Sequence, residues 1–136
     1  MFLEPSAAAI ASKRETPYQL SSLKESINQL RENLEDKEAI VDGAVRFFKL
    51  LAEGTGNKVL ILNQEPLNHL LRPSLAFMIK RVKQAGPRIL EAQEIILKFL
   101  NAHDEEQART WMIKHINDFK RGYVLAGIDM KHIVLN

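Results

Sequence analysis

The chain has 136 residues, a length that suits one domain, and we expect that domain to span residues 1–136. It contains no cysteine, which excludes disulfides and thiolate metal sites and is compatible with a reducing compartment. Because the N-terminus lacks the pattern of a signal peptide, the cytoplasm is the expected compartment. Lysine and arginine total 19 against 17 acidic residues, for a formal charge of +2, so we do not expect this chain itself to contact DNA.

Two short segments could be mistaken for targeting or binding signals. The longest early apolar run, Ala7 to Ala11, is far shorter than the ~20 residues that a bilayer span needs, so no membrane association is expected. The basic run Lys80-Arg81-Val82-Lys83 is short, and a solvated helix end is the preferred interpretation over a nucleic-acid patch.

The first half of the chain predicts three helices. A short helix of small residues covers 7–11. Thr16-Pro17-Tyr18-Gln19 has the features of a capping box and opens a second helix. The apolar residues of that helix recur at spacings of three and four along one narrow seam, which fits either the core or a dimer interface, with the core preferred. The seam consists of Leu20, Leu23, Ile27, Leu30 and Leu34.

A third helix is predicted from the capping residue Asp36 to about Gly54, where glycines can end it. On its polar face, acidic and basic residues lie four apart and can form ion pairs. The candidate pairs are Asp42 with Arg46 and Lys49 with Glu53.

The second half continues the helical pattern. Residues 58–83 predict a kinked helix or two helices that meet near Pro73, because proline removes an amide donor. A break and a new start are expected at Gly86-Pro87. Asp104 opens a last helix that ends between Gly122 and Gly127. With no alternating strand pattern, the sequence predicts an all-α antiparallel bundle of six or seven helices.

Two polar residues lie on otherwise apolar helix faces. Gln93 falls between Ile89 and Ile96, and His115 falls between Met112 and Phe119. Because an unpartnered buried amide or imidazole costs about 1–3 kcal/mol, each needs the backbone, the other side chain, a water or a ligand as partner. Since the two are expected on adjacent helices, they also predict an internal polar pocket.

Catalysis is poorly supported by the remaining residues. His69, His103 and His132 have no spacing that would assemble a metal site, and Gly54-Thr55-Gly56 is better explained as a helix end than as a phosphate loop. No serine–histidine motif is present. We therefore expect neither an enzyme nor a cofactor.

Three stretches, in the right order, resemble one known family. They are Leu3-Glu4-Pro5 with the alanines that follow, Phe47 to Asn57, and Ala92 to Leu97 with Asp104, Ala108, Met112 and His115. Together they resemble the FCD domain, the C-terminal ligand-binding domain of the FadR subfamily of GntR transcription regulators.

Many members of that family hold a divalent metal, which anchors a carboxylate effector, through one aspartate and three histidines. The resemblance places Ala44 at the aspartate position and Phe48, Gln93 and His115 at the histidine positions, so only one ligand is kept and we expect no metal. These four residues, with Asn63 as a further polar point, are then expected to line a pocket for an organic acid or acyl compound. His115 would contact the carboxylate, with a charge that depends on pH near neutrality.

The resemblance also implies the setting of the domain. A winged-helix DNA-binding domain would precede residue 1, any DNA contact would run through it, and effector binding would reposition it. A homodimer is expected. The alternative is a structural dimerisation module whose ligand-free core has closed around Phe48.

Overall fold

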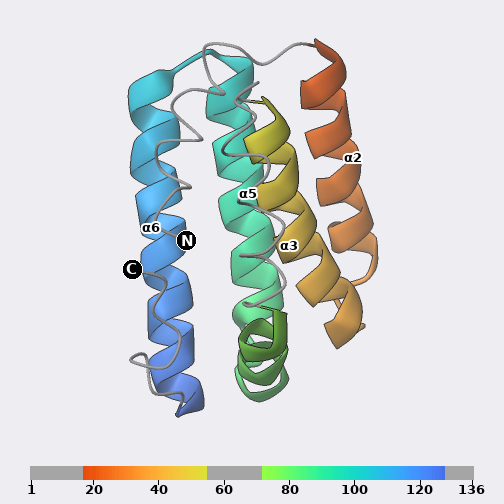
Figure 1. Ribbon diagram of the computed structural model, residues 1–136, viewed down its shortest axis with the longest axis vertical. Coiled ribbons are helices and arrows are strands. Elements are labelled where there is room, and N and C mark those ends of the chain that lie inside the picture. Colours follow the sequence, from red (N-terminus) through yellow and green to blue (C-terminus); the bar gives the residue numbers. More distant parts are fainter. Residues whose placement is uncertain (1–16, 55–71, 128–136) are drawn as a thin grey trace.

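The computed structural model describes residues 17–54 and 72–127, which form a helical bundle (Figure 1). Within these residues there are five helices and no strand, which confirms the all-α prediction. The predicted helix over 7–11 and most of the predicted 58–83 helix lie outside the described residues. The helices are α2 (Pro17–Glu32), α3 (Lys37–Gly54), the segment 72–81, α5 (Ala85–Asn101) and α6 (Glu105–Ala126).

Neighbouring helices in the bundle run mostly antiparallel. Helix α2 packs against α3 and α5 and runs opposite to both, and α6 packs along α5 in the opposite direction (Figure 1). The segment 72–81 lies at the lower end of this view, near the start of α5 and the end of α6. No helix within 17–54 or 72–127 is long and apolar enough to cross a membrane.

Local signals in the sequence fix several helix ends. The Asp36 carboxylate accepts hydrogen bonds from the backbone N–H groups of Glu38 (3.0 Å) and Ala39 (3.2 Å), so it caps α3 as predicted. Asp104 caps α6 in the same way, accepting from the Gln107 N–H at 3.1 Å. Gly127, with φ of 82°, ends α6 in the left-handed conformation that glycine adopts without strain.

The start of α5 differs from the prediction. The helix begins at Ala85, so the expected break at Gly86-Pro87 is wrong by two residues, and the connection lies at 82–84. Pro87 is the third residue of the helix, where the backbone amide has no intrahelical acceptor and a proline costs little. A Cβ on Gly86 would lie 2.8 Å from Ile40 Cδ1, so this glycine also allows α5 to approach α3 closely.

The apolar seam of α2 belongs to the core, which confirms the preferred interpretation. Its three central residues are at most 2% exposed, and its two outer residues pack partly buried against the same core. The central residues are Leu23, Ile27 and Leu30, and the outer ones are Leu20 and Leu34.

Two charged side chains on the polar face of α3 bond to other helices rather than to each other. Arg46 Nε donates to Ser26 Oγ on α2 at 2.7 Å, and Asp42 accepts from Arg72 Nη1 at 2.6 Å. The candidate Asp42–Arg46 pair is therefore wrong. The reason is that neighbouring elements place partners within reach of both side chains, which helical spacing alone does not reveal.

The basic run at 80–83 lies at the surface, as the solvated-end interpretation predicts. Lys80, Arg81 and Lys83 are exposed, whereas Val82 is half-buried. The Arg81 guanidinium lies over the Phe77 ring, 4.0 Å from its centroid.

The cap of α3 provides a test of this fold. Asp36→Ala removes the acceptor of two backbone N–H groups and is expected to lower the free energy of unfolding by about 1 kcal/mol. Urea denaturation followed by circular dichroism measures the change. Glu35→Ala, one residue earlier and also exposed, is the control and should stay within about 0.5 kcal/mol of the parent. Equal losses in both variants would contradict the assignment of the cap.

Candidate functional site

The four interior positions expected from the sequence lie inside the bundle. Ala44 and Phe48 on α3 are 0% and 1% exposed, Gln93 on α5 is 0% exposed, and His115 on α6 is 2% exposed. Asn63 lies outside the described residues. The inward orientation of these side chains is thus confirmed, whereas their role in binding a ligand stays a prediction.

Gln93 obtains part of its hydrogen bonding from the backbone of α3. Its Nε2 donates to the Gly43 carbonyl oxygen at 3.4 Å, a long bond. Its Oε1 is buried and has no hydrogen-bond partner among the residues that the structure describes. The backbone of the described residues therefore provides a hydrogen-bond partner for the amide nitrogen of Gln93 but not for its amide oxygen.

His115 lies within a group of aromatic rings. Its ring centroid is 4.6 Å from that of Phe119, 5.8 Å from Phe48 and 6.5 Å from Phe47. The Nε2 atom is buried and has no hydrogen-bond partner in 17–54 or 72–127. We call these four side chains the aromatic group; it occupies the space around Phe48.

Burial decides the charge of His115. Desolvation lowers the pKa of this imidazole to about 4, against a weaker opposing effect of the Asp118 carboxylate, which raises it. His115 is therefore neutral at pH 7. Without a bound ligand, the cost of burying the charged ring outweighs the attraction of the Asp118 carboxylate, and the expected titration of His115 beside a ligand carboxylate stays a prediction.

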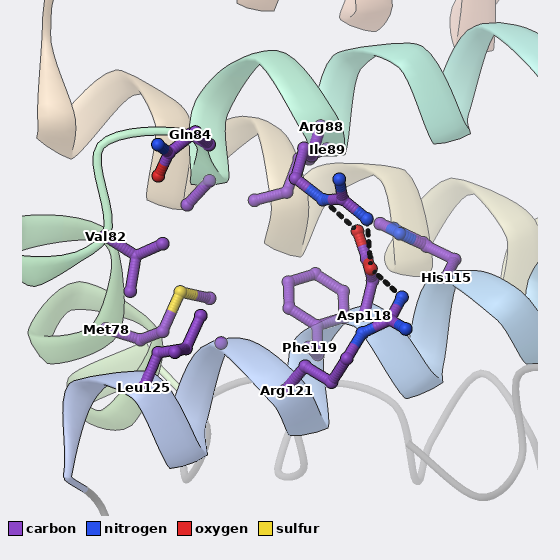
Figure 2. A pocket seen from close by; sticks show the side chains of 12 residues that line it. Met78, Val82, Gln84, Arg88, Ile89, His115, Asp118, Phe119, Arg121 and Leu125 are labelled. Atoms are coloured by element: carbon purple, nitrogen blue, oxygen red, sulfur yellow. Dashed lines mark hydrogen bonds and ion pairs between the residues drawn. The ribbon is translucent and has the colours of Figure 1, made fainter.

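A cleft of 490 Å³ opens beside this group, between residues 78–85, the first turns of α5 and the second half of α6 (Figure 2). His115 lies in its wall. We call it the large cleft. Its apolar lining includes Met78, Val82, Ile89, Phe119 and Leu125.

A second, small cleft of 260 Å³ is bounded by Trp111 and Lys114. Arg88, His115, Asp118 and Arg121 line both clefts and so form the wall between them. Neither cleft includes Gln93, Phe48 or Ala44 in its lining. Of the four predicted site residues that the structure describes, only His115 lines these clefts.

The charged part of this wall is a bridge of three residues that sequence reasoning missed. Asp118 accepts from Arg88 Nε at 2.7 Å and Arg88 Nη2 at 2.6 Å, and also from Arg121 Nη2. The hydrogen bond from Arg88 is the main effect that lowers the pKa of Asp118, so this carboxylate is ionised at pH 7. Only the i, i+3 spacing of Asp118 and Arg121 is visible in the sequence, and such pairs are common on helix surfaces.

A family-type metal does not fit the residues at the four interior positions. They comprise one imidazole, one amide, one phenyl ring and one methyl group, and a divalent ion prefers charged or imidazole donors. Elsewhere in the described ranges, no group of three or more histidine or acidic residues could hold an ion.

Within the described residues the chain is an all-helical domain with a cleft that opens to solvent. Beside the cleft, His115 has a buried nitrogen without a hydrogen-bond partner among these residues, and Gln93 has a buried oxygen in the same state. The sequence profile of the FCD domain matches residues 1–118. The chain also resembles the structure of E. coli McbR/YncC, with a TM-score of 0.80 and 22% identity over 90% of this chain and 59% of that one. No curated relative matches the chain.

The chain belongs to the FCD domain family, and McbR/YncC is a GntR-family regulator. The FCD domain is a domain of transcription regulators, so this match points to a regulatory role. The chain spans 59% of the length of McbR/YncC.

The low pKa of His115 predicts a specific pH dependence. The unfolded state takes up a proton near pH 6.5 and the folded state only near pH 4, so stability falls as pH falls between these values. The loss is about 3 kcal/mol at pH 4. His115→Phe should remove that part of the loss in urea unfolding curves taken from pH 7 to pH 4.

The control for this prediction is His103→Asn. His103 is exposed and has a φ of 54°, a conformation that asparagine tolerates. This variant should keep the pH dependence of the parent. A parent-like pH dependence in His115→Phe would show that the buried imidazole is not its source.

Proposed function

We propose that the chain is the effector-sensing domain of a FadR-type GntR regulator and that a small organic acid or acyl compound binds in the large cleft. The observation that carries this proposal is the position of His115. Its buried Nε2 has no hydrogen-bond partner in the described part of the chain, yet the residue lies in the wall of a cleft of 490 Å³ that opens to solvent.

An unpartnered buried nitrogen favours a ligand on energetic grounds. Such an atom costs about 1–3 kcal/mol, which a ligand group that forms the missing hydrogen bond recovers on binding. The neutral imidazole has one donor and one acceptor nitrogen, so it can meet a hydroxyl, an amide or a carboxyl group. Gln93, Ala44 and Phe48 are buried but do not line the large cleft, so their contact with a ligand, like that of Asn63, stays a prediction.

We propose that binding needs no metal. The interior positions offer one imidazole and one amide, which supports recognition by hydrogen bonds and contact area instead.

The proposed signal passes through the elements that surround the cleft. A ligand between the segment 72–81, α5 and α6 would change the spacing of these helices, and a winged-helix DNA-binding domain outside this chain would respond. A two-fold homodimer would place two such domains on a symmetric operator.

A structural dimerisation module is the second candidate. The aromatic group favours it, because three rings surround Phe48 and fill the space that the family resemblance assigns to the effector. The two candidates differ in whether the large cleft binds anything.

A pair of matched variants tests the location of binding. Val82→Phe adds bulk to the wall of the large cleft and should weaken effector binding about tenfold or more. Val124→Phe makes the same change at a 67% exposed position outside the clefts and should bind like the parent. Isothermal calorimetry with octanoate, succinate and octanoyl-CoA gives the affinities. No heat from any of them with the parent chain would favour the structural module.

Metal independence has its own test. Addition of Zn²⁺, Ni²⁺ or Mn²⁺ to chelator-treated protein should leave the melting temperature unchanged, because the interior lacks a donor set for these ions. Differential scanning fluorimetry measures the shift and elemental analysis of the untreated protein measures bound metal. One equivalent of metal that raises the melting temperature would overturn the metal-free proposal.

A further inference from the structure

The wall between the two clefts carries an excess positive charge. Arg88 from α5 and Arg121 from α6 both donate to the single carboxylate of Asp118 (Figure 2). Two guanidinium groups against one carboxylate leave a net charge of +1. Arg88 and Arg121 are also open to solvent, with side chains 57% and 70% exposed, so an arriving ligand can reach them.

The two guanidinium groups retain unused donors. Arg88 bonds Asp118 through Nε and Nη2, which leaves its Nη1, and Arg121 bonds through Nη2, which leaves its Nε and Nη1. None of these remaining nitrogens has a partner within the described residues. Each unused N–H group can donate a charge-assisted hydrogen bond to a carboxylate oxygen, so these donors match a second anion beside Asp118.

The cleft below this charge is apolar. Met78 and Phe119 are each 2% exposed and Ile89 is 4% exposed, and all three line the large cleft. Leu125 lines it too and is 76% exposed, so an apolar ligand would also cover a large hydrophobic side chain that now faces water. Figure 2 shows the arginines on one side of these residues, with His115 beside them.

Since a charged edge adjoins an apolar hollow, we propose that Arg88 and Arg121 form an anion-binding point for the carboxylate of an organic acid whose hydrocarbon part lies in the large cleft. This inference rests on the proposed function and adds the chemistry of the ligand and its orientation. Asp118 holds the two guanidinium groups in place and competes with the ligand carboxylate for them.

Trp111 supplies a local reporter for the test. It is the only tryptophan of the chain and lines the small cleft together with Arg88 and Arg121. Its emission should change saturably with octanoate, and 1-octanol, which has the same chain length and no charge, should bind about tenfold more weakly or worse. Equal affinities for octanoate and 1-octanol would overturn the anion-binding point while leaving a sensing cleft intact.

Variants of the bridge separate binding from a purely structural role. Arg121→Gln and Arg88→Gln should each weaken octanoate binding about tenfold and change 1-octanol binding little. Asp118→Asn should instead tighten octanoate binding several-fold, because it removes the competing carboxylate. Lys120→Gln is the charge-matched control on α6, exposed and outside both clefts, and should bind octanoate like the parent.

The outcomes of these titrations are distinct. Parent-like octanoate affinity in both arginine variants, or weaker octanoate binding in Asp118→Asn, would overturn the inference. Loss of octanoate and 1-octanol binding together in Val82→Phe, with the arginine variants unaffected, would support the sensing cleft but reject its anion-binding point.

Discussion

The aromatic contact between α3 and α6 determines where a ligand can bind. Phe47 and Phe48 on α3 meet His115 and Phe119 on α6, and each ring lies within 6.5 Å of His115. Because these rings are almost wholly buried, they keep the imidazole uncharged and occupy the interior beside Phe48. The large cleft opens next to this contact, toward the end of α6.

The sequence predicted the helices well where short-range chemistry sets their ends. Asp36 and Asp104 cap helices as expected, because a carboxylate that bonds nearby backbone N–H groups acts within one turn. The break at Gly86-Pro87 was placed two residues late, because a proline in a first turn looks the same in sequence as one that ends a helix. The difference depends on where the connection folds, which is a tertiary property.

The buried residues of the candidate site could be predicted from the sequence, whereas its contacts between helices could not. Helical periodicity identified Gln93 and His115 as inward-facing, because a polar residue on an apolar face stands out in one helix. Arg88 and Asp118 are 30 residues apart and meet only when α5 packs on α6, so no local pattern reveals their hydrogen bonds. The same packing also explains the low pKa of His115, since spacing indicates burial but not its extent.

The proposed absence of a metal and the charged edge of the large cleft are physically connected in the proposed site. A carboxylate placed deep in the bundle would face a neutral imidazole and phenyl rings, with no cation to offset its desolvation. At the edge, Arg88 and Arg121 supply the positive charge and remain partly hydrated, so neither partner loses all of its water. The proposed metal-free site would therefore favour an acid whose charged end stays near solvent and whose hydrocarbon part enters the cleft.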